Sequence, residues 1–107
     1  MQMLKEETMS YKKTMEGVNY LVQHELDMAC EDNGSSFSSD HEAFAIILEE
    51  FCESKEELAI ISECLYGMWR SVRQDNKSGD ILTDIERHAR RLACEAIQVA
   101  AMARKAM

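Results

Sequence analysis

The stretch from Ser39 to Arg73 carries an almost uninterrupted helical pattern, and it constrains the fold more than any other part of the chain. Its large apolar residues recur every seven positions, which on an α-helix places them along one slowly drifting seam. The members of this seam are Phe44, Phe51, Leu58, Leu65 and Val72. Such a seam is typical of a helical-bundle core, so we expect these side chains to be buried, together with Met68 and Trp69.

Three glutamates interrupt a second apolar stripe on roughly the opposite side of the same predicted helix. Glu50, Glu53 and Glu57 lie between Ile46 and Ile60, within about 80° of one another on the helical wheel. If this stripe packs against another helix, the carboxylates lose water and repel one another, and a bound cation would remove the conflict. If it faces solvent, the glutamates are ordinary surface residues, which is the default for a run of charges. The pattern alone leaves both interpretations open.

Composition places the chain among single-domain, all-α proteins. Proline is absent, there are four glycines, and 46% of the 107 residues are hydrophobic, so we expect one domain over residues 1–107. The net charge of −8 argues against nucleic acid as a partner, because backbone binding depends on clustered positive charge. No apolar run approaches the roughly 20 residues of a membrane span, and the first ten residues lack the apolar core of a secretory signal. We therefore expect a cytoplasmic protein without a membrane partner. The four cysteines show no C-x-x-C pairing and are expected to be buried, reduced thiols.

Polar connections divide the chain into three main helices. The first is predicted from Leu4 to about Cys30, with Gly34 supplying left-handed backbone at its end. Ser39, with Glu42 three residues later, forms a capping box and starts the second helix. Residues 1–38 then hold the first helix and its loop, and residues 39–107 hold the helical core. A small chain buries only a modest core, so we expect this three-helix bundle to be completed by dimerisation into a larger one.

The third helix follows a polar connection over residues 74–80, with Asp80 or Thr83 as its N-cap, and extends to near Lys105. Residues at three- and four-residue steps form its apolar stripe: Ile81, Ile85, Ala89, Leu92, Ala96, Val99 and Ala103. A neighbouring stripe with the same spacing is mostly polar: Asp84, His88, Arg91, Glu95, Gln98 and Met102. A polar helix face is solvated by default, but this stripe could also face the glutamates of the second helix. Oxygen ligands on two facing helices suit a hard cation such as Mg²⁺.

The segments LEEFCE and CEAIQVAAMA resemble the two motifs of the MazG-like all-α nucleoside triphosphate pyrophosphohydrolases, in particular small phage or prophage members. That family carries ExxE on one helix and ExxD on a later one, which together bind magnesium. Glu50 and Glu53 match the first motif, and Glu95 matches the acid that opens the second. Gln98 stands where the family has aspartate. The resemblance covers roughly residues 40–107.

The resemblance implies hydrolysis of a nucleoside triphosphate to a monophosphate and pyrophosphate with Mg²⁺ or Mn²⁺. It implies Glu50, Glu53, Glu95 and Gln98 as metal ligands and Glu57 as a further ligand or a base for water. Arg91 and His88 are expected to face the substrate, because guanidinium groups pair well with phosphate. An amide brings no negative charge, so Gln98 predicts weaker metal binding and weak or absent activity. The alternative is a non-catalytic helical assembly or protein-binding module with the same architecture.

Overall fold

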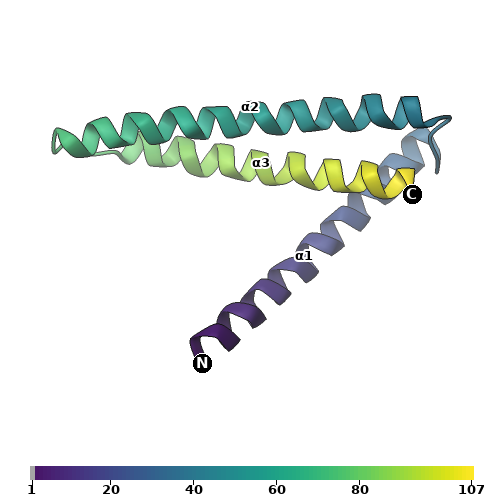
Figure 1. Ribbon diagram of the computed structural model, residues 1–107, viewed down its shortest axis with the longest axis horizontal. Helices are drawn as coiled ribbons and strands as arrows, with labels where there is room; N and C mark the ends of the chain where they lie inside the picture. The colour runs from purple at the N-terminus through teal and green to yellow at the C-terminus, as the bar shows by residue number, and fades with distance from the viewer. Residues whose placement is uncertain (1) are drawn as a thin grey trace.

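The computed structural model describes residues 2–107, with side chains from Thr8 onward, and this part of the chain is helical without any strand. The helices are α1 (Gln2–Asn33), α2 (Asp40–Arg73) and α3 (Gly79–Ala106). Helices α2 and α3 form a long antiparallel hairpin, and α1 crosses it at the end where α2 begins and α3 ends (Figure 1). α3 packs along α2 and against α1, while the N-terminal half of α1 projects away from the hairpin (Figure 1). The all-α prediction with three main helices is confirmed.

The loop between α1 and α2 follows the predicted turn chemistry. Gly34 adopts a left-handed backbone with φ of 87°, and its N–H donates to the carbonyl of Cys30 at 2.9 Å, which ends α1. The Ser39 hydroxyl accepts a hydrogen bond from the backbone N–H of Glu42 at 3.1 Å, so Ser39 is the N-cap of α2. The Glu42 carboxylate accepts from the hydroxyl of Ser38 rather than closing the predicted box on Ser39.

The start of α3 differs from the prediction. The helix begins at Gly79, so Asp80 and Thr83 lie inside its first turns and the two predicted N-caps are wrong. The hydroxyl of Thr83 instead donates to the carbonyl of Gly79 at 3.1 Å. The helix begins one residue before Asp80 and four before Thr83, because glycine is compatible with a helix start as well as with a break.

The seam expected to form the core of α2 is exposed, so that prediction is wrong. Phe44, Phe51, Leu58, Leu65 and Val72 keep between 49% and 67% of their surface accessible. Trp69, at 60%, is also outside the core. The stripe that carries Glu50 and Glu57 is half-buried instead, because it is the side of α2 on which α3 packs. Two apolar stripes line α2, and a single antiparallel partner covers only one of them.

The core is correspondingly thin. Among residues 8–107, only three apolar side chains are buried: Val22, Ala43 and Ala101. The radius of gyration is 17.9 Å, whereas a compact domain of this length has about 13 Å. The molecule is an open hairpin with one crossing helix, and most of its large apolar side chains keep access to water.

The first loop contacts the C-terminal end of α3 through Phe37. The ammonium of Lys105 lies 4.6 Å from the centroid of the Phe37 ring, and Lys105 is only 9% exposed. A cation placed over an aromatic face is attracted by the ring quadrupole, and here the attraction fastens the loop to the C-terminal turn of α3.

The four cysteines are free thiols, but none is buried. Cys30 and Cys64 are half-buried, and Cys52 and Cys94 are exposed, so the expectation of burial is wrong. None of the helices, over the residues that the structure describes, combines the length and the apolar character needed to cross a bilayer.

Candidate metal centre

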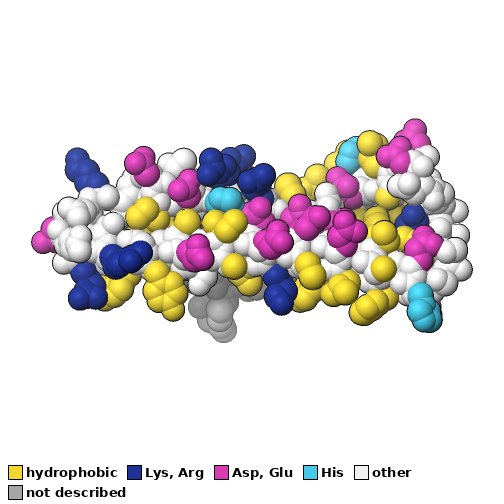
Figure 2. Space-filling view, turned by 90° about the horizontal axis from the view of Figure 1, so that it is seen from above, with side chains coloured by type: hydrophobic (Ala, Val, Ile, Leu, Met, Phe, Trp, Pro, Cys, Tyr) yellow, Lys and Arg dark blue, Asp and Glu magenta, His cyan; other side chains and the backbone are white. Residues whose placement is uncertain are grey.

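Three carboxylates converge near the middle of the α2–α3 hairpin. Glu50 and Glu53 stand one turn apart on α2, and Glu95 comes from α3. One carboxylate oxygen of each lies within 4.8 Å of the other two. Figure 2 shows acidic side chains in a row along the middle of the molecule, with hydrophobic side chains along its edge. The structure therefore brings together Glu50, Glu53 and Glu95, which we call the carboxylate triad.

The antiparallel register explains why these residues meet. Moving one heptad back along α2 corresponds to moving one heptad forward along α3, so Glu57 faces His88 and Glu50 faces Glu95. Each of these residues occupies the half-buried side of its helix. The packing of the hairpin therefore forces the acids together, which is the first of the two interpretations that the sequence left open.

The triad is electrostatically strained. Glu50 Oε2 and Glu95 Oε2 are shielded from solvent and have no hydrogen-bond partner. The pKa of Glu50 is raised above 4.5, chiefly because burial removes the carboxylate from water and secondly because Glu53 repels it. The pKa of Glu53 is also raised, first by hydrogen bonding to Glu95 and then by repulsion from the same group. A bound cation would relieve each of these costs.

The donor set suits a hard divalent cation. Mg²⁺ and Mn²⁺ prefer carboxylate oxygens and retain waters, whereas Zn²⁺ sites usually combine histidine and cysteine. The triad offers three carboxylates and one edge open to water, since Glu53 is more exposed than Glu50 and Glu95. Glu50, Glu53 and Glu95 therefore fit the ion that the sequence resemblance implies.

The predicted ligand Gln98 stands one turn after Glu95 on α3, at the place where α3 meets α1. It lines a cavity of about 120 Å³ together with His24 and Glu25 of α1. Glu25 was not among the predicted site residues, yet its charge adds to the raised pKa of Glu50 after burial and the nearer acids. Glu25 lies between Val22 and Leu26, two apolar residues of the first helix. An acid within an apolar stripe is the same pattern that singled out the glutamates of α2, so the sequence contained an indication of Glu25 as well.

The predicted residues Glu57, His88 and Arg91 form a second polar cluster one turn away from the triad. Glu57 Oε2 lies 2.5 Å from His88 Nδ1, and both side chains are mostly buried, at 16% and 12% exposure. Glu57 Oε1 lies 3.8 Å from Arg91 Nε, on a largely exposed guanidinium. Glu57 is therefore held by two basic groups and is not brought into the triad.

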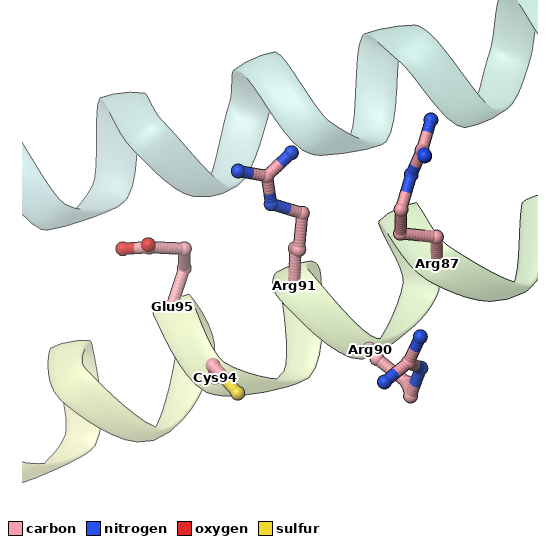
Figure 3. A pocket seen from close by; sticks show the side chains of 5 residues that line it. All are labelled: Arg87, Arg90, Arg91, Cys94 and Glu95. Atoms are coloured by element: carbon pink, nitrogen blue, oxygen red, sulfur yellow. The ribbon is translucent and has the colours of Figure 1, made fainter. Parts of the chain in front are cut away.

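An arginine-rich pocket of about 370 Å³ adjoins the triad on α3 (Figure 3). Arg87, Arg90, Arg91, Cys94 and Glu95 line it. Figure 3 shows Glu95 and Arg91 projecting from α3 on the side of α2, whereas Arg90 projects from the opposite side of the helix. Arg87 and Arg90 pair with acids of their own helix, Asp84 at 3.0 Å and Glu86 at 2.8 Å, as expected for arginines beside acids.

Comparisons with known proteins found no matching family model, no matching curated protein and no matching solved structure.

Proposed function

We propose that this chain is a metal-dependent nucleoside triphosphate pyrophosphohydrolase related to the small phage or prophage MazG-like enzymes. The observation that carries the proposal is the convergence of Glu50, Glu53 and Glu95 from two helices, with ligand oxygens within 4.8 Å of one another. Buried, unpartnered oxygens on Glu50 and Glu95 add to it, because such atoms are costly unless something pairs with them. A cytoplasmic location belongs to the same proposal.

The triad would hold the cation. Bound Mg²⁺ or Mn²⁺ supplies a Lewis acid that polarises a phosphoryl oxygen and lowers the pKa of coordinated water. Glu50 and Glu95 would hold it from the more buried side, and Glu53 would hold it from the more exposed side. Gln98, which faces the α1 side of α3, adds at most a neutral amide oxygen, so the expected affinity is lower than with a fourth carboxylate.

The arginine-rich pocket would receive the phosphate chain. Glu95 belongs to both the triad and this pocket, so a phosphate bound to the cation would lie beside the guanidinium of Arg91. Glu57 is hydrogen-bonded to His88 and forms an ion pair with Arg91 at 3.8 Å, which holds Arg91 beside the pocket that it lines. The same Glu57–His88 pair can accept a proton from an attacking water, the role of a general base.

The test is pyrophosphate release from a panel of ribo- and deoxyribonucleoside triphosphates with Mg²⁺ or Mn²⁺. Glu53→Gln should lower turnover at least a hundredfold, because it removes a charged ligand while keeping the shape of the side chain. Glu63→Gln, an equal change of charge at an exposed position of α2, is the matched control and should stay within twofold of the parent. Equal loss in both variants, or turnover in EDTA, would contradict the assignment.

The exposed seam of α2 favours a second candidate, a non-catalytic helical assembly module. This function needs an unpartnered apolar face and no metal, and the seam provides such a face. The two candidates differ in their response to metal, because a ligand that binds only the folded state raises the melting temperature. A chain that releases no pyrophosphate and gains no stability from Mg²⁺ or Mn²⁺ would support the assembly module. Dimerisation, expected from the sequence, is part of either proposal.

A further inference from the structure

The exposed residues of α2 continue the seven-residue spacing of the seam into a complete stripe. Between the members of the seam stand Leu48, Lys55, Ser62 and Trp69, each four residues after a seam residue and each exposed. Alternating three- and four-residue steps of this kind define the contact line of a helix in a coiled coil or a four-helix bundle. We call the whole line, from Phe44 to Val72, the α2 stripe.

The area of the α2 stripe is large enough for a stable interface. Its seven apolar members are between 43% and 67% exposed. With full side-chain areas of roughly 150–250 Å² for residues of this size, the stripe presents on the order of 700 Å² of apolar surface. The largest apolar patch of a typical monomer is about 300–600 Å², and a standard interface buries about 800 Å² per partner. A protein that is monomeric in water rarely exposes an apolar patch of this size.

The charges at the two ends of α2 indicate what covers it. The first turn carries Asp40 and Glu42, and the last turn carries Arg70 and Arg73. If a second α2 lies antiparallel on the first, the acidic end of each helix meets the basic end of the other. A parallel arrangement would place acids beside acids and arginines beside arginines, and it would also bring the two Lys55 ammonium groups face to face.

The stripe is also symmetric about its own middle. Leu58 is equally far in sequence from Phe44 and from Val72, so an antiparallel pair with its two-fold axis near Leu58 matches the stripe end to end. The ammonium of Lys55 lies 5.7 Å from the centroid of the Phe51 ring, which leaves its aliphatic stem along the apolar surface. A self-complementary surface of this kind fits a second copy of the same chain.

We propose that two copies of this chain pair through the α2 stripe in antiparallel orientation, with the two-fold axis near Leu58, so that each α2 lies between its own α3 and the α2 of the second copy. The interface uses the side of α2 away from the carboxylate triad. It therefore holds whether or not the triad supports hydrolysis, and its test does not depend on activity.

The first experiment compares the molar mass in solution, by light scattering after gel filtration, of the parent, Leu58→Glu and Leu82→Glu. Leu82 of α3 is 49% exposed, close to the 57% of Leu58, and lies outside the stripe, which makes it the matched control. The parent and Leu82→Glu should be dimers at micromolar concentration. Leu58→Glu should weaken dimerisation at least a hundredfold while circular dichroism still reports a helical protein. A monomeric parent, or a dimer that survives Leu58→Glu, would overturn the proposal.

A second experiment tests the orientation by oxidative cross-linking, with the parent treated alongside to measure the contribution of the native cysteines. A mixture of Phe44→Cys and Val72→Cys should give a disulfide-linked heterodimer above the level in the parent. Val72→Cys alone should not, because antiparallel pairing places its two copies at opposite ends of the interface. Efficient self-linking of Val72→Cys would indicate parallel pairing and overturn the proposed arrangement.

Discussion

Replacing Glu50 by glutamine should make the metal-free protein more stable at alkaline pH. Glu50 and Glu95 present carboxylate oxygens within 4.8 Å, and each has one buried oxygen without a partner. Glutamine keeps the size of the side chain, removes one negative charge and supplies an N–H group that can donate to Glu95. The substitution therefore removes a repulsion and pairs an isolated acceptor at the same time.

The distance between the oxygens of the triad limits the size of the effect, because all of them lie within 4.8 Å of one another. At that limit two like charges repel by about 0.9 kcal/mol in bulk water and about 3.5 kcal/mol at an effective dielectric constant of 20. Glu50 is only half-buried, so solvent screening brings the expected gain down to about 1 kcal/mol. For a domain of this size, that gain corresponds to a rise of about 4–8 °C in Tm.

The pH dependence has a definite sign. The pKa of Glu50 is raised above 4.5 by burial and by repulsion from Glu53, so folding favours the protonated carboxyl group. Protonated Glu50 therefore contributes to the stability of the parent when the pH is below the pKa of Glu50 in the unfolded chain. This contribution is lost as the pH rises through the raised pKa of Glu50 in the native state. The Tm advantage of Glu50→Gln in EDTA should therefore be present at pH 8 and vanish near pH 4.5.

Metal should reverse the order of the two proteins. At a tenfold excess of Mg²⁺ over its dissociation constant, the parent gains about 1.4 kcal/mol, and Glu50→Gln, which lacks one ligand charge, gains much less. Thermal denaturation followed by circular dichroism, at pH 4.5 and 8 with EDTA or Mg²⁺, measures all four conditions. Glu63→Gln serves as the control for net charge. A lower Tm for Glu50→Gln at pH 8 in EDTA, or equal Mg²⁺ stabilisation of both proteins, would refute this account of the triad.

Three further substitutions test individual contacts. Ser39→Ala should lower the free energy of unfolding by about 1 kcal/mol in thermal denaturation, because the α2 N-cap loses its side-chain acceptor. Phe37→Leu keeps an apolar cover over Lys105 but removes the aromatic face, and should cost about 1 kcal/mol in the same assay; no change would show that packing alone holds the loop. His88→Ala leaves the mostly buried carboxylate of Glu57 with a single distant partner and should cost about 1–3 kcal/mol in urea denaturation at pH 7.

Local features of the sequence were enough to predict the helices, because each depends on residues close together in the chain. Ser39 caps α2 through its own side chain, and Gly34 ends α1 through its own backbone conformation. The start of α3 at Gly79 was missed, since the same glycine is compatible with a helix start and with a break.

The choice between the two stripes of α2 could not be predicted from spacing. Phe44 and Leu58 belong to the more apolar stripe, yet α3 packs on the stripe that contains Glu50. Which stripe is covered depends on the partner helix, and α3 places His88 against Glu57, a contact that phenylalanine or leucine could not make. Glu50, Glu53 and Glu95 lie close together, as the spacing predicted, because they share a register across the hairpin, whereas Glu25 enters only through the crossing of α1.

The way α1 is attached has a consequence for the order of folding. Helices α2 and α3 are joined by a short turn, so their contacts close small loops and form quickly. The contact of Gln23 with Arg104 at 3.4 Å joins residues 81 positions apart, so it closes a much longer loop and should form more slowly. Docking of α1 is therefore the late step, and the amides of its described residues should exchange with solvent through undocking while those of α2 remain protected. The cavity that Gln98 and Glu25 line between α3 and α1 would open whenever α1 undocks.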